Sequence, residues 1–152
     1  ARAPLDGLGL PTVALWGNGT WTKTRLTLPS GQQRRFVNQP DALLNLGIDA
    51  NVPMLSTTFG LSANWNSGYR QEITAANNTR VQSDISGTFR VDAAARVELT
   101  KSLFLSLSAL NLFAPVERRR DDNIAATGAL AGFSRTTEPT YRTFYARLQA
   151  AF

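Results

Sequence analysis

Apolar and polar residues alternate along five stretches of the chain, and this alternation restricts its fold more than any other feature. Successive side chains of a β-strand point to opposite faces of the sheet, so a period of two residues predicts strands. In each stretch one face is apolar, as with Leu44, Leu46 and Ile48, and the other is mainly polar. The predicted strands are 42–52, 55–66, 89–99, 103–113 and 144–152. The sequence therefore predicts an all-β protein.

The connectors between these strands alternate in length. Short turns are predicted at 53–54 and 100–102, and long surface loops rich in Gly, Asn, Pro and charge are predicted at 29–41, 67–88 and 114–140. A further strand is expected within 12–28, with Val13, Leu15 and Trp21 on its apolar face. About six antiparallel strands in a meander, with tight turns at one end and long loops at the other, are the expected architecture.

The apolar faces carry no charge in any of the five strands, although charged residues are 18% of the chain. Lipid imposes such a face on a transmembrane β-barrel, where a basic residue at the bilayer midplane costs about 2–4 kcal/mol. The core of a soluble β-sandwich imposes it too. The opposite faces are rich in Ser, Thr, Asn and Gly, which suits a polar lumen, and aromatic residues lie near strand ends, which suits an interfacial girdle. These aromatic residues are Trp21, Trp65, Phe89, Phe144 and Phe152. The pattern favours a transmembrane barrel over a sandwich.

Composition removes most catalytic chemistry. The chain has no Cys and no His, which excludes disulfides, thiol nucleophiles, Cys/His zinc sites and imidazole acid–base catalysis. Because no paired carboxylates are spaced to converge, we expect no catalytic residue, no metal ligand, no cofactor and no enzyme activity. The net charge of +5 is scattered along the chain, so no nucleic-acid groove is predicted.

The C-terminal part carries two short motifs, Asn111-Leu112-Phe113 and Arg142-Thr143-Phe144-Tyr145, the second followed by alternation to Phe152. Upstream lie Gly17-Asn18-Gly19-Thr20-Trp21-Thr22 and, after Gln39-Pro40, Asn45-Leu46-Gly47-Ile48-Asp49. In this order the segments resemble the strands of TonB-dependent outer-membrane receptors over nearly the whole chain. Residues 1–152 are thus similar to the C-terminal segment of such a receptor barrel.

The resemblance implies a 22-stranded barrel of which this chain is a fragment, without the plug domain and the TonB box. It implies uptake of a scarce ligand, such as a ferric siderophore, haem, cobalamin or a saccharide, powered by the TonB complex through the missing plug. The implied location is the outer membrane of a Gram-negative bacterium, among lipid and lipopolysaccharide. The loops would be extracellular and the C-terminus periplasmic, and residues 1–5 would end a preceding strand.

Several residues take roles under this resemblance. Phe144, Leu148 and Phe152 would present the last strand to the barrel assembly machinery, by strand addition at an open edge, besides facing lipid. Asn111 interrupts the alternation, and we expect a bulge there. Arg118, Arg119 and Arg120 lie in the longest predicted loop, where they are candidates for contact with an anionic ligand or lipopolysaccharide, or are simply solvated beside Asp121-Asp122.

Two other protein classes remain open. A small autonomous outer-membrane barrel or adhesin of eight strands would need two more strands, which 81–89 and 129–134 would supply by pairing with each other. A soluble carbohydrate-binding β-sandwich would use the apolar face as its core.

Overall fold

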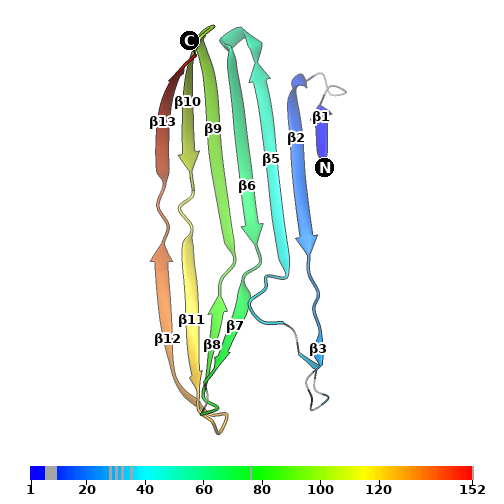
Figure 1. The fold of residues 1–152 in the computed structure, drawn as a ribbon, viewed down its shortest axis with the longest axis vertical. Helices are drawn as coiled ribbons and strands as arrows, with labels where there is room; N and C mark the ends of the chain where they lie inside the picture. Colours follow the sequence, from blue (N-terminus) through cyan, green and yellow to red (C-terminus); the bar gives the residue numbers. More distant parts are fainter. Residues whose placement is uncertain are drawn as a thin grey trace.

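The structure, a computed structural model, describes residues 1–5, 10–27, 29, 31, 33–34, 36–75 and 77–151. Its main element is an open seven-stranded antiparallel sheet in the order β1-β2-β5-β6-β9-β10-β13 (Figure 1). The strands are β1 (Arg2–Leu5), β2 (Leu10–Trp21), β5 (Ala42–Val52), β6 (Thr57–Asn66), β9 (Thr88–Thr100), β10 (Leu103–Leu110) and β13 (Thr143–Ala150). The predicted all-β antiparallel class is confirmed.

The sheet has one strand more than the six expected, because the N-terminal residues pair with β2 as β1. The tight connectors lie where they were predicted. A 3-10 turn, η2 (Pro53–Leu55), joins β5 to β6, and Lys101-Ser102 joins β9 to β10. Residue 55 belongs to η2, so β6 begins at Thr57 instead of 55. Strands β1 and β13 are each paired on one side only, so the described sheet is not closed into a barrel.

The predicted long loops 67–88 and 114–140 are wrong as loops, because each contains a β-hairpin. A four-stranded sheet has the order β12-β11-β8-β7, from β7 (Tyr69–Thr74), β8 (Arg80–Ile85), β11 (Val116–Ile124) and β12 (Leu130–Pro139). We call it the hairpin sheet. It lies beyond one end of the seven-stranded sheet, where β7 and β8 prolong β6 and β9, and β11 and β12 prolong β10 and β13 (Figure 1). These four strands carry polar residues on both faces, so they lack the apolar face by which alternation predicts a strand.

The eight-stranded alternative required 81–89 to pair with 129–134, and that pairing is wrong. Strand β11 lies between β8 and β12 and bonds to both. The third predicted loop, 29–41, lies partly outside the described residues; near it, β3 (Leu26–Thr27) pairs with β4 (Gln33–Arg34).

Strand register aligns the predicted apolar faces of the long strands on one side of the sheet, as predicted. One cross-strand row runs Leu15, Ile48, Leu61, Ala93, Ala109, Phe144. The next row runs Val13, Ala50, Phe59, Ala95, Leu107, Ala146. We call this side of the seven-stranded sheet the apolar face and the other the polar face. The predicted orientation of Val13, Leu15 and Trp21 is confirmed.

No second layer covers the apolar face among the described residues. Of the described hydrophobic residues on it, only Ala42 and Val91 are buried, each 7% exposed, whereas Leu46 is 49% exposed and Phe144 68%. The hairpin sheet prolongs the strands and does not pack over them (Figure 1). Within the described part of the chain, no helix is long and apolar enough to cross a membrane. The described part of the chain therefore forms one extended layer without an internal core.

Candidate functional site

The break between β10 and β11 is built around Asn111. This residue has a φ of 60°, a left-handed conformation that Asn tolerates better than most residues. Its backbone N–H donates to Asp92 Oδ1 at 2.7 Å, and its Nδ2 donates to the Tyr141 carbonyl at 3.1 Å. Strand β10 ends at Leu110, so the structure has a turn between two strands here where the sequence predicted a bulge.

The two C-terminal motifs meet at this break. Arg142 Nε donates to the Leu112 carbonyl at 2.7 Å, and Thr143 pairs with Leu110 at the start of β13. The Phe113 ring stacks on Phe89, with centroids 6.3 Å apart and planes inclined by 16°. Contacts between the motifs thus hold β10 and β13 together where the seven-stranded sheet meets the hairpin sheet.

The polar face carries a row of amides near the same junction. The row runs Asn18, Asn45, Asn64, Arg90 across β2, β5, β6 and β9. Asn45 Nδ2 donates to Asn18 Oδ1 at 2.7 Å, and Arg90 Nη2 donates to Glu117 Oε1 of β11 at 2.5 Å. A cavity of about 330 Å³ opens between the two sheets here, and its lining includes Asn45, Asn64, Tyr69, Arg90 and Glu117.

These groups suit recognition of a polar ligand better than catalysis. Amides offer donors and acceptors, Tyr69 adds a ring and a hydroxyl, and the Arg90–Glu117 pair adds both charges. No described residues form a group of three or more Asp or Glu able to hold a metal ion. We call the cavity lined by Asn45, Asn64, Tyr69, Arg90 and Glu117 the junction pocket.

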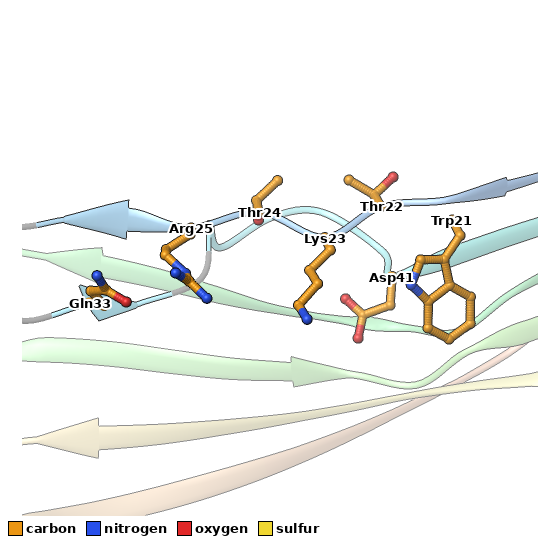
Figure 2. A pocket seen from close by; sticks show the side chains of 7 residues that line it. All are labelled: Trp21, Thr22, Lys23, Thr24, Arg25, Gln33 and Asp41. Atoms are coloured by element: carbon orange, nitrogen blue, oxygen red, sulfur yellow. The ribbon is translucent and has the colours of Figure 1, made fainter.

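A second cavity, of about 450 Å³, lies beside the extended segment 22–25 that follows β2. Figure 2 shows Trp21, Lys23, Arg25 and Asp41 on one side of this segment, while Thr22 and Thr24 point away. The Thr24 hydroxyl accepts a hydrogen bond from the Phe36 N–H at 3.2 Å, which links the segment that follows β2 to the segment that leads into β5. The groove combines charges of both signs with the apolar surface of the Trp21 ring.

The three consecutive arginines lie in strand β11 and point to alternate sides. Arg119 pairs with Asp121 at 2.7 Å, and Arg120 pairs with Asp122 at 2.8 Å. Hydrogen bonds from the buried Ser83 hydroxyl and from Arg119 lower the pKa of Asp121 below its ordinary value. In β strands, neighbours in sequence face opposite ways, so Arg118 and Arg120 share a face that Arg119 does not. The triplet does not converge on one ligand.

The C-terminal strand forms one edge of the seven-stranded sheet. Phe144 and Leu148 lie on the apolar face opposite Ala109 and Leu105, and are 68% and 64% exposed. Phe152, the third residue expected to present this strand to the assembly machinery, lies outside the described residues. The other edge of β13 is unpaired within the described chain, so its backbone groups are available for strand addition.

Comparison with known proteins identifies no relative: no family model, no curated protein and no solved structure matches the chain. The likeness to TonB-dependent receptors therefore rests on the motifs and their contacts alone.

The sequence pattern did not single out the junction pocket. Alternation predicts polar faces for Asn45, Asn64 and Arg90, but their alignment in one row depends on register, which the pattern leaves open. Gly47 is another residue whose role appears only in the structure. A Cβ there would lie 2.2 Å from the Trp16 ring, so the ring can lie across β5 only because residue 47 has no side chain.

Proposed function

We propose that this chain forms part of the wall of an outer-membrane β-barrel transporter of the TonB-dependent kind. Its apolar face contacts lipid, its polar face lines the lumen, and the hairpin sheet stands on the extracellular side. The observation that carries the proposal is the continuous apolar face that nothing in the described chain covers. Water would make such a face costly, at about 25 cal/mol per Å² of apolar surface.

Strand lengths support a membrane setting. Strands β2, β5, β6 and β9 have 12, 11, 10 and 13 residues, close to the roughly 9–11 needed for a tilted strand to cross the hydrocarbon layer. A β-sandwich needs a second sheet about 10 Å away, facing the first. The hairpin sheet does not take that position (Figure 1).

An aromatic band supports the position of the membrane boundary. Trp65 pairs with Phe89 across β6 and β9, and Phe89 stacks on Phe113. Trp21 and Phe144 lie at the corresponding ends of β2 and β13. Aromatic residues gather in this way at the interfaces of membrane barrels. The hairpin sheet begins directly beyond the band, which suits a part that stands in the aqueous phase.

The transport role rests on the polar face. The junction pocket offers hydrogen-bonding groups and one ion pair at the level where an incoming ligand would pass from the extracellular hairpins into the lumen. The contacts of Asn111 with Tyr141 and of Arg142 with Leu112 support the TonB-dependent assignment, because they give the motif residues a joint structural role. The free edges of β1 and β13 would pair with further strands of the barrel, and the assembly machinery would engage β13.

Cysteine labelling tests the membrane assignment directly, because the chain has no Cys and each introduced thiol is unique. Leu61→Cys and Ser62→Cys are neighbours on β6 that face opposite sides, paired with Ala93 and Asp92. In lipid vesicles, a spin label at 61 should be relaxed by oxygen, which dissolves in lipid, and one at 62 by a water-soluble nickel chelate. If the nickel chelate reaches both labels equally, or if the chain is a folded monomer in buffer without detergent, the proposal is wrong.

A further inference from the structure

The hairpin sheet separates its charges by face. Register places Arg70, Asp84, Arg120 and Arg135 in one cross-strand row, and Glu72, Gln82, Asp122 and Phe133 in the next. One face thus carries Arg70, Arg80, Arg118, Arg120 and Arg135 with Glu72, Asp84 and Asp122. The opposite face carries Arg119 with Glu117, Asp121 and Glu138. The described hairpins are balanced in total charge, but one face is basic and the other acidic.

The junction pocket shows which face lies on which side. Tyr69 and Glu117 belong to the acidic face, and they line the pocket together with Asn45, Asn64 and Arg90 of the polar face. The acidic face therefore adjoins the polar face of the larger sheet. The basic face adjoins the apolar face, beyond the aromatic band of Trp65, Phe89 and Phe113.

The centre of the basic face holds more positive charge than the described carboxylates there neutralise. Arg120 lies directly opposite Arg135, and like charges in that position destabilise a strand pair. Both guanidinium groups lie over the Phe133 ring, at 5.3 and 5.5 Å from its centroid. Arg120 pairs with Asp122, whereas Arg118 and Arg135 make no ion pair with any described carboxylate. Phe133 itself is 57% exposed.

Arg118 is the arginine of the basic face that lies nearest the aromatic band. It bonds through its backbone to Ser86, three residues along the chain from Phe89. At about 3.3 Å per residue, Arg118 lies roughly 10 Å beyond the band, and Arg120 and Arg135, two residues farther on, lie roughly 17 Å beyond it. The headgroup region extends roughly 5–8 Å from the hydrocarbon edge, so these long side chains would reach back toward it.

We propose that the basic face, centred on Arg118, Arg120, Arg135 and Phe133, binds the phosphate groups of lipid headgroups around the barrel. This inference rests on the proposed function, because it needs the apolar face in lipid. Guanidinium groups form paired hydrogen bonds with phosphate oxygens, and an anion between Arg120 and Arg135 would relieve their repulsion. The acidic face, turned toward the lumen, would be kept away from the same phosphates.

The experiment compares two double variants that lose the same charge. Arg118→Gln/Arg135→Gln removes the two unpaired arginines of the basic face and leaves the Arg70–Asp84 and Arg120–Asp122 pairs intact. Arg96→Gln/Arg147→Gln is the matched control, with both changes on exposed residues of the polar face, which the proposal turns away from lipid. The full chain and both variants are reconstituted with vesicles of phosphatidylcholine alone or mixed with phosphatidylglycerol, and circular dichroism checks their strand content.

Two readouts separate the two proposals. Protection of the chain from protease in either vesicle tests insertion, and its absence in both would overturn the proposed function and this inference with it. The preference for phosphatidylglycerol vesicles, measured as a ratio of partition coefficients, tests the inference alone. Each arginine near an anionic surface is worth about fivefold in partition, so the Arg118/Arg135 variant should lose roughly tenfold or more while the control changes by less than about twofold. Equal losses in both variants, or full competition by inorganic phosphate at matched ionic strength, would overturn it.

Discussion

The Asn111 side chain donates a hydrogen bond to the Tyr141 carbonyl, 3.1 Å away, across the gap where β10 and β13 both give way to the hairpin sheet. The same residue holds a φ of 60° and donates its backbone N–H to Asp92. One residue thus sets the backbone turn after β10 and links it to β9 and to the connector between β12 and β13. The position demands a residue that accepts left-handed geometry and also carries a side-chain donor.

We expect two substitutions at Asn111 to separate these contributions. Asn111→Gly keeps the left-handed conformation and loses the side-chain hydrogen bond, which should cost about 1 kcal/mol of unfolding free energy. Asn111→Ala loses the bond and adds the left-handed penalty, for a total of about 2–3 kcal/mol. Urea unfolding in detergent, followed by tryptophan fluorescence, measures both. Equal costs for the two variants would show that backbone geometry at residue 111 is unimportant.

The contact of Trp16 with Gly47 predicts a size limit on the polar face. A Cβ at 47 would fall 2.2 Å from the Trp16 ring, so Gly47→Ala forces the ring or the strands apart and should cost about 1–3 kcal/mol. Gly60→Ala is the matched control, because its Cβ would meet only Asp49 Oδ1 at 3.5 Å, an ordinary contact. The control should be neutral or slightly stabilising, since Gly weakens strands. Unfolding free energies and Trp16 emission report both effects, and equal behaviour of the two variants would contradict this contact.

The carboxyl group of Asp121 predicts a pH dependence in the hairpin sheet. Hydrogen bonds from Ser83 and Arg119 lower its folded pKa, so the stabilisation is complete above the ordinary value of 3.8 and is lost as pH falls through the lower folded value. Carboxyl-carbon NMR should show an Asp121 midpoint below 3.8 in the native chain. Ser83→Ala should move that midpoint upward more than Arg119→Gln does, because the Ser83 bond is the larger cause. A native midpoint at or above 3.8 would refute the assignment.

The alternation of apolar residues predicted most of the larger sheet because one of its faces has a single chemical character. Strand β5 matches the expected 42–52, and β9 and β13 differ from their predicted bounds by one or two residues within the described chain. An uncharged apolar face gives the sequence a hydrophobic period of two residues whether lipid or protein covers that face. The same property means that the pattern cannot tell the barrel from the sandwich.

The strands of the hairpin sheet have no hydrophobic period of this kind. Arg70, Glu72, Arg119 and Asp121 place charges on both of its faces, so hydrophobic periodicity is absent. These strands are specified by cross-strand pairs such as Arg70 with Asp84, which appear only once the register is known. Resemblance singles out Asn111-Leu112-Phe113 and Arg142-Thr143 but does not predict that they meet, because the hydrogen bonds that join them depend on a backbone turn that alternation does not encode.

The crossing of Gly68 and Gly87 gives the last prediction, which concerns the link between the two sheets. Gly68 has a φ of 74°, and a Cβ on it would lie 2.5 Å from the Ile85 carbonyl oxygen. A Cβ on Gly87 would lie 2.4 Å from the Asn66 carbonyl oxygen. The neighbouring atoms on both sides belong to the backbone, so no flexible side chain can move aside. The β6–β7 and β8–β9 connectors can therefore pass this closely only with glycine at positions 68 and 87.

We therefore expect Gly68→Ala and Gly87→Ala each to loosen the hairpin sheet while leaving the seven-stranded sheet folded. Amide hydrogen exchange should accelerate in β7 and β8, by at least about tenfold, and remain unchanged in β5. Gly128→Ala is the control for the conformational penalty alone, because its φ is 86° and nothing lies within 4 Å of its Cβ position. That variant should affect only the turn between β11 and β12. If Gly68→Ala and Gly128→Ala have equally local effects, the close backbone approach does not couple the two sheets.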